Sequence, residues 1–169
     1  MKVLEHDEAM MRLALEQAQK AEHCGEVPVG AIVVMDGEII ARAYNQPIAR
    51  HDPTAHAEIL ALRAAGEQRG NYRLSGATLY VTLEPCPMCT GAMVHARIGR
   101  LVYGAQDPRT GAAGSVFNLA CSDALNHRME VTGNVLGDEC AEQLRNFFKQ
   151  RRKGGEIFQG DASGLGETQ

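Results

Sequence analysis

The stretch Leu-Glu-Pro-Cys-Pro-Met-Cys, residues 83–89, places two cysteines three positions apart and sets a proline on each side of the first. Pro87 suits the start of a helix, because its missing N–H would have no partner there. Cys86 and Cys89 are therefore predicted to share one helical turn and to point the same way. The partial positive charge of a helix N-terminus lowers the pKa of a thiol towards the thiolate that a metal needs. The stretch thus predicts two metal ligands at a helix entrance.

A second motif, Thr-Ala-His-Ala-Glu at residues 54–58, lies upstream of this cysteine pair. If both motifs sit where the chain enters a helix, the two helix starts can converge on one point beside a sheet. His56 then supplies a third ligand, and three protein ligands leave a fourth position for water, as in catalytic zinc sites. Glu58 is the expected base. Because residues two apart on a regular helix do not face each other, this site needs His56 at the helix entrance.

Two other functions fit part of this pattern. A Cys-x-x-Cys pair is also typical of thioredoxin-like redox chemistry, but that motif usually lacks an upstream His-x-Glu. A zinc-stabilised binding module without turnover would use the same three ligands. Glu58 argues against such a module, since a structural zinc site has no use for a carboxylate there.

The flanking sequence predicts helices alternating with short strands. Asp7 is the expected N-cap of the first helix, and Gly25 is its expected stop. Asp36-Gly37 between two β-branched runs predicts a hairpin. A short helix within residues 115–127 is left open. The predicted helices are 7–23, 57–68, 87–96 and 137–152, and the predicted strands are 29–35, 38–44, 77–82, 100–105 and 130–134.

This alternation predicts an α/β fold with a mixed sheet in two or three layers. The chain of 169 residues is long enough for one domain with a sizeable core. That domain is expected to span residues 1–153. Residues 154–169 contain five glycines and no periodicity, which predicts a flexible tail.

Composition limits the compartment and the partners. No apolar run approaches the roughly 20 residues that cross a bilayer, and the N-terminus lacks the apolar core of a signal peptide. The five cysteines do not form a disulfide pattern, so a cytoplasmic protein is expected. Cys24, Cys121 and Cys140 are expected to be small buried side chains. The net charge of −4 does not favour a polyanion, but residues 149–153 carry four cations directly after Phe147 and Phe148.

The two motifs together resemble the signature of the zinc-dependent cytidine/deoxycytidylate deaminase superfamily, which pairs His-Ala-Glu with Pro-Cys-x-x-Cys. Further segments resemble the bacterial tRNA-specific adenosine deaminases within that superfamily. The resemblance covers roughly residues 6–153 and leaves the tail unmatched. The segments that carry the narrower resemblance are residues 45–47, 51–58, 82–86 and 110–115.

This resemblance implies a three-layer α/β/α fold with a five-stranded mixed sheet, one zinc ion per subunit and a homodimer. The implied reaction is hydrolytic deamination of adenosine to inosine at the wobble position of a tRNA anticodon, chiefly that of an arginine tRNA. Water attacks C6 of the adenine. Glu58 moves a proton from that water to N1 and then helps ammonia to leave. Glu84 is expected to be structural and to accept hydrogen bonds from backbone N–H groups.

The resemblance also implies contacts with the anticodon stem-loop. Asn45 is expected to bond a purine edge, and Asp107 and Arg109 to touch the ribose or backbone, although a plain turn is the alternative for Asp107. One of the two phenylalanines is expected to be core and the other to lie near the RNA. A deaminase of a free nucleobase, nucleoside or nucleotide is the second reading, because it shares the zinc chemistry. The predicted RNA-binding residues are Asn45, Asp107, Arg109, Phe147, Phe148, Arg151 and Arg152.

Overall fold

The computed structural model describes residues 1–161 of the chain, and the side chains of residues 1–154. These residues form five helices and five strands. Their bounds are α1 Lys2–His23, β1 Gly30–Met35, β2 Glu38–Tyr44, α2 Pro47–Arg50, α3 Ala57–Arg69, β3 Thr78–Leu83, α4 Pro87–Ala96, β4 Arg100–Ala105, β5 Glu130–Thr132 and α5 Gly137–Asp161.

The strands form one mixed sheet in the order β2-β1-β3-β4-β5. Strand β1 runs antiparallel to both β2 and β3, while β3, β4 and β5 are parallel. The predicted hairpin is confirmed, because Asp36 and Gly37 take φ values of 54° and 77° between β1 and β2. The five-stranded mixed sheet expected from the sequence is therefore present.

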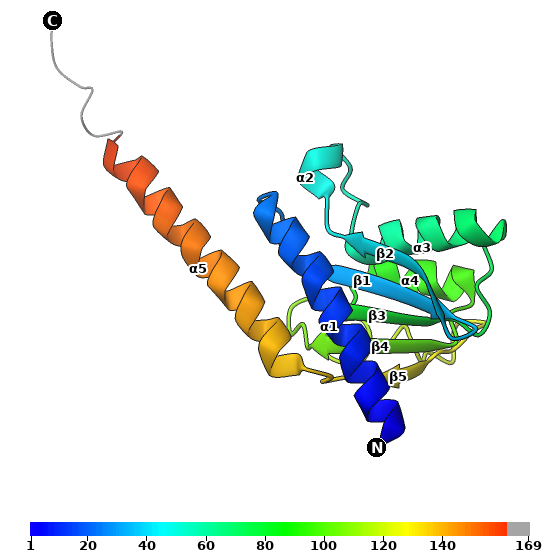
Figure 1. Cartoon of the computed structure of the whole chain (residues 1–169). Coiled ribbons are helices and arrows are strands. Elements are labelled where there is room, and N and C mark those ends of the chain that lie inside the picture. The colour runs from blue at the N-terminus through cyan, green and yellow to red at the C-terminus, as the bar shows by residue number, and fades with distance from the viewer. Residues whose placement is uncertain (162–169) are drawn as a thin grey trace, which may run out of the picture.

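Helices cover both faces of this sheet, with α1 and α5 on one side and α3 and α4 on the other (Figure 1). Successive strand residues point to opposite faces, so each strand feeds both layers. Leu79 belongs to the hydrophobic core that includes α3 and α4. The next residue, Tyr80, packs in the core beneath α1 and α5. The three-layer arrangement is confirmed, and it leaves the N-termini of α3 and α4 on the same side of the sheet.

The first helix begins earlier than the sequence predicted. It starts at Lys2, so the assignment of Asp7 as its N-cap is wrong. Asp7 is instead 2% exposed, and its carboxylate accepts hydrogen bonds from Arg100 at 2.7 and 2.8 Å and from the Tyr80 hydroxyl at 2.9 Å. Burial raises the pKa of Asp7, but these hydrogen bonds and the charge of Arg100 outweigh burial and hold the pKa below its usual value. Gly25, with φ of 75°, follows the end of the helix as expected.

Two further expectations need correction, and the structure answers one question that the sequence left open. Residues 115–127 form turns and no helix. The last helix continues to Asp161 instead of ending at Arg152, since an established helix adds one hydrogen bond for each further residue and tolerates glycine at a cost of about 1 kcal/mol. The predicted tail therefore begins in helix, and residues 162–169 lie outside the described part. Cys24 and Cys121 are exposed, because each lies in a turn, whereas Cys140 is buried as expected.

Candidate active site

The two motifs lie at the entrances of neighbouring helices. His56 is the N-cap residue of α3 and Cys86 is the N-cap residue of α4, both with extended backbone at ψ of 153° and 172°. Neither side chain makes a capping hydrogen bond to its own helix, so both can turn towards a shared point. Cys89 follows in the first turn of α4. His56 thus takes the position at the helix entrance that the site requires.

Three donor atoms converge at this point. The Nδ1 atom of His56 lies 3.4 Å from the Sγ atom of Cys89 and 3.7 Å from that of Cys86. All three potential ligand atoms lie within 4.8 Å of one another, and no second such cluster occurs within the described residues. Tetrahedral zinc binds nitrogen and sulfur at roughly 2.0 to 2.3 Å, which separates such donors by about 3.5 Å. The His-Cys-Cys cluster, which comprises His56, Cys86 and Cys89, therefore fits zinc.

The two cysteines of the cluster are chemically coupled. A hydrogen bond from Cys89 lowers the pKa of the Cys86 thiol to about 4. The same contact, together with burial, raises the pKa of Cys89. The pair therefore shares one proton while no metal is bound. Metal binding displaces that proton, because the thiolate is the ligand.

Glu58 lies in the first turn of α3, two residues beyond His56, and its side chain is buried. Burial raises the pKa of this carboxyl group, although hydrogen bonding with Cys89 acts in the opposite direction. That contact places the carboxyl group beside the His-Cys-Cys cluster. A carboxyl group whose pKa is raised towards neutrality can both take up and deliver a proton, which suits acid–base catalysis.

Glu84 is a second buried carboxylate near the cluster, and it is 2% exposed. One oxygen accepts hydrogen bonds from the N–H groups of Ala113 and Ser115, both at 3.1 Å. The other accepts from the Asp107 N–H at 3.3 Å and from the Ser115 hydroxyl. The expectation that Glu84 bonds backbone N–H groups is confirmed.

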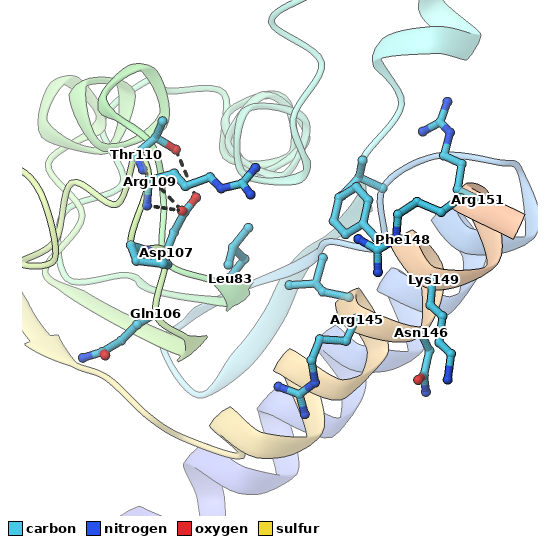
Figure 2. Close-up of a pocket in the computed structure, with 14 residues that line it drawn as sticks. Leu83, Gln106, Asp107, Arg109, Thr110, Arg145, Asn146, Phe148, Lys149 and Arg151 are labelled. Atoms are coloured by element: carbon cyan, nitrogen blue, oxygen red, sulfur yellow. Dashed lines mark hydrogen bonds between the residues drawn. The ribbon is translucent and has the colours of Figure 1, made fainter. Parts of the chain in front are cut away.

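A cleft of about 990 Å³ separates residues 106–110 from helix α5. Figure 2 shows the side chain of Arg109 extending from the loop towards the cleft, with Phe148 and Arg151 on the opposite, helical side. Five of the predicted RNA-binding residues line this cleft, whereas Asn45 and Phe147 do not. The five are Asp107, Arg109, Phe148, Arg151 and Arg152.

The two adjacent phenylalanines have different environments. Phe147 is 8% exposed and lies beneath the guanidinium of Arg151, whose carbon is 5.6 Å from the ring centroid. Phe148 is 42% exposed and lines the cleft. The expectation of one core phenylalanine is confirmed for Phe147.

Asp107 holds the turn that follows it. Its carboxylate accepts hydrogen bonds from the N–H of Arg109 at 2.9 Å and from the N–H and hydroxyl of Thr110 at 3.3 and 3.0 Å. This is the turn geometry that the sequence left open as an alternative. The RNA contact of Asp107 stays a prediction.

Asn45 is buried and directly follows the end of β2. Its N–H donates to the Val29 carbonyl at 3.0 Å, and its side-chain amide makes no hydrogen bond to another residue of the described part. Glu26, which the sequence did not single out, accepts hydrogen bonds from the N–H groups of Ile48 and Ala49 at 3.0 and 3.2 Å. Glu26 thereby fixes α2, the short helix between Asn45 and His56. No local pattern marks it, because its partners lie 22 and 23 residues away.

One cation of the cleft, Arg145, was missed, and Lys149 was noted only as part of the charged run at residues 149–153. Arg145 and Lys149 line the cleft from α5. Arg145 lies outside the run of charge at residues 149–153, which drew attention to the helix end alone. Their spacing of four residues puts them on one helical face. Helical periodicity, applied to charge as well as to apolar residues, would have linked Arg145 to Lys149.

The chain matches known proteins over most of its length. The sequence model described as the cytidine and deoxycytidylate deaminase zinc-binding region matches residues 4–105. The tRNA-specific adenosine deaminase of Haemophilus influenzae is 55% identical over 150 residues, which cover 88% of this chain and 87% of that protein.

Solved structures agree with this relationship. One solved structure comes from a study of A-to-I editing by tRNA:A34 deaminases at the wobble position of transfer RNA. Its sequence is 47% identical to this chain, and the two structures superpose with a TM-score of 0.78 over 80% of this chain and 99% of that chain. The guanine deaminase from Nitrosomonas europaea is 26% identical with a TM-score of 0.69, over 83% of each chain. The chain therefore belongs to the zinc-dependent cytidine and deoxycytidylate deaminase family, and within it to the group of the tRNA-specific adenosine deaminases.

Proposed function

We propose that this chain converts adenosine to inosine by hydrolytic deamination at the wobble position of a tRNA anticodon, chiefly that of an arginine tRNA. The observation that carries the proposal is the convergence of His56, Cys86 and Cys89 beside a buried carboxyl group, that of Glu58. The 55% identity to the Haemophilus influenzae tRNA-specific adenosine deaminase supports the choice of substrate. Residues 1–153 form the proposed deaminase domain.

Zinc is the cofactor, and when bound it lowers the pKa of a coordinated water from about 15.7 to about 7, which supplies a nucleophile at neutral pH. His56, Cys86 and Cys89 would hold this ion. Glu58 accepts the proton that the attacking water gives up as the water oxygen bonds to C6 of the adenine. The same carboxyl group delivers the proton to N1. It then carries the second proton of that water from the new C6 hydroxyl group to the amino group, and the C6–N bond breaks as the C6 carbonyl forms, so that water and adenosine yield inosine and ammonia. One group can serve both directions because burial raises its pKa.

The RNA contacts are assigned to two regions. Asn45 offers a side-chain amide that both donates and accepts hydrogen bonds, as recognition of a purine edge requires. The cleft beside α5 offers Arg109, Arg151 and Arg152 for phosphates and the exposed ring of Phe148 for stacking on an unpaired base. Asp107 contributes through the turn that presents Arg109.

A homodimer is part of the proposal. Exposed apolar side chains occur on α4, as Met88, and in the segment between β4 and β5, as Val116, Phe117 and Leu125. Exposed apolar surface of this kind is typical of a face that binds another protein. No helix in residues 1–161 is long and apolar enough to cross a membrane. We place the reaction in the cytoplasm, where the tRNA substrate is found.

Incubation of the purified zinc-loaded protein with an anticodon stem-loop that carries adenosine at the wobble position tests this function. Nucleoside analysis by mass spectrometry is expected to find inosine in the stem-loop and no deamination of free adenosine or guanine. The Glu58→Gln variant is the matched control and is expected to form no inosine. The second candidate is a free-base deaminase, which the structural similarity to a guanine deaminase favours. Turnover of the free base with an unmodified stem-loop would establish that candidate instead.

A further inference from the structure

We propose that Glu84 is a positioning residue that holds the 106–115 loop as one wall of the cleft and thereby sets the affinity for RNA without touching it. The choice of RNA as the ligand rests on the proposed function. The hydrogen bonds and packing that support the role of Glu84 are independent of that function. Glu84 is as buried as Asp7, yet no cation neutralises it by an ion pair in the described part of the chain. Its charge is balanced by the loop alone.

Four hydrogen-bond donors surround this carboxylate, three of them backbone N–H groups of the 106–115 loop. A buried anion is costly unless its oxygens are hydrogen-bonded, and bonds to an ionised acceptor are roughly twice as strong as neutral ones. The Asp107 N–H marks the start of the loop and the Ser115 N–H marks its end. One side chain therefore ties both ends of the loop to the same point.

The loop also packs tightly against the segment that leads to Cys86. The Ala112 N–H donates to the Pro85 carbonyl at 2.8 Å, and the Glu84 N–H donates to the Ala105 carbonyl at 2.8 Å. A Cβ atom at Gly111 would collide with the Glu84 carboxylate. The loop and the turn before the metal ligand are therefore one unit, with Glu84 at its centre.

The fixed loop presents its cation to the cleft. Asp107 is held by Glu84 through its N–H and in turn holds the N–H of Arg109. The Arg109 side chain extends towards the cleft between the loop and α5 (Figure 2). A loop that is already ordered loses less conformational entropy when RNA binds, which increases affinity. Glu84 therefore acts on binding through Asp107 and Arg109.

The Glu84→Gln variant separates this role from a metal or acid–base role. Glutamine keeps the size of the side chain but replaces one acceptor oxygen by an NH₂ group that faces N–H donors. The KM for the anticodon stem-loop is expected to rise roughly 10-fold, as expected from the loss of hydrogen bonds to a charged group. The kcat and the zinc content are expected to stay within about twofold, and the Ala113 and Ser115 amides are expected to exchange hydrogen faster.

Two controls accompany this variant. Asp7→Asn neutralises an equally buried carboxylate on the buried face of α1 and is expected to lower stability while the KM stays unchanged. Ser115→Ala removes one of the four donors without introducing an unsatisfied group, so the chain is expected to fold, with faster exchange at Asp107 and Ala113 and a small rise in KM.

Two results would overturn the proposal. One is hydrogen exchange of the loop amides at the wild-type rate in Ser115→Ala, and also in Glu84→Gln if that variant folds. The other is a collapse of kcat together with loss of zinc in Glu84→Gln, which would place this carboxylate at the metal. If the wild-type protein forms no inosine, the proposed function fails, while the exchange measurements still decide whether Glu84 orders the loop.

Discussion

The Nδ1 atom of His56 lies 3.4 Å from the Sγ atom of Cys89, although the two residues are 33 positions apart in the chain. The sheet produces this proximity. Helices α3 and α4 follow β2 and β3 and pack on the same face, where they contact each other (Figure 1). Their N-termini therefore open towards one point, and the partial positive charge of both helix ends favours the thiolates that collect there.

Removal of one sulfur is expected to abolish zinc binding. Residues that hydrogen-bond to metal ligands contribute about 10- to 100-fold to metal affinity. Cys86 is a predicted direct ligand, so Cys86→Ala is expected to lower the affinity for zinc by more than this. Elemental analysis of the purified variant measures the zinc content. Cys24→Ala, at an exposed cysteine in a turn, is the matched control and is expected to keep one zinc per chain. Full zinc occupancy in Cys86→Ala would remove this residue from the ligand set.

Glu58→Gln is expected to keep zinc and fold but to lower kcat on the stem-loop by roughly 10²- to 10⁴-fold, which is the usual contribution of a general acid–base group. The amide has nearly the same size, so the buried site is filled, but it cannot carry a proton. Single-turnover measurement of inosine formation reports the chemical step directly. A near-normal single-turnover rate would assign the proton transfers to another group.

The cations at the end of α5 are expected to bind phosphates. Each contact with a single-stranded phosphate contributes about 0.7 to the slope of log K against log salt. The Arg151→Ala/Arg152→Ala double variant is therefore expected to lower that slope by about 1.4, measured by equilibrium binding of the stem-loop at several salt concentrations. Arg69→Ala, which removes an exposed cation paired with Asp36, is the control. Equal slopes in the double variant and the wild type would show that this helix end does not touch RNA.

The ion pair of Asp7 and Arg100 is expected to make stability depend on pH. The pKa of Asp7 in the folded chain lies below its ordinary value of 3.8. The pair therefore contributes its full stabilisation above about pH 4 and loses it as the pH falls through the folded pKa. Above pH 4, Asp7→Asn is expected to lower the free energy of unfolding by about 3 kcal/mol, the low end for a broken buried pair, because Arg100 remains 19% exposed.

Urea denaturation of the wild type and Asp7→Asn at pH 7 and pH 3 measures this difference, which is expected to shrink at the lower pH. Glu130→Gln is the control, since Glu130 contacts the same arginine at 3.6 Å but is 75% exposed. Its effect is expected to stay below about 1 kcal/mol. A difference for Asp7→Asn that grows towards pH 3 would contradict the depressed pKa.

Local sequence signals placed most elements correctly. Pro87 marks the start of α4, and Asp36-Gly37 marks the hairpin, because both act through their own backbone geometry. The His-x-Glu and Cys-x-x-Cys spacings also reveal the donor types, since metal preference is a property of the side chains themselves. These features depend on a few adjacent residues, which is why the sequence alone determines them.

The partners of the buried carboxylates were decided only by the tertiary structure. Asp7 reads as an N-cap in the sequence, yet it bonds Arg100, 93 residues away. Glu84 and Glu26 likewise bond groups more than 20 residues distant, so no periodic pattern contains them. A buried charge must find donors wherever the packed layers bring them. The sequence therefore determined the elements and the metal chemistry, while the packing of layers decided which polar groups hold the site in place.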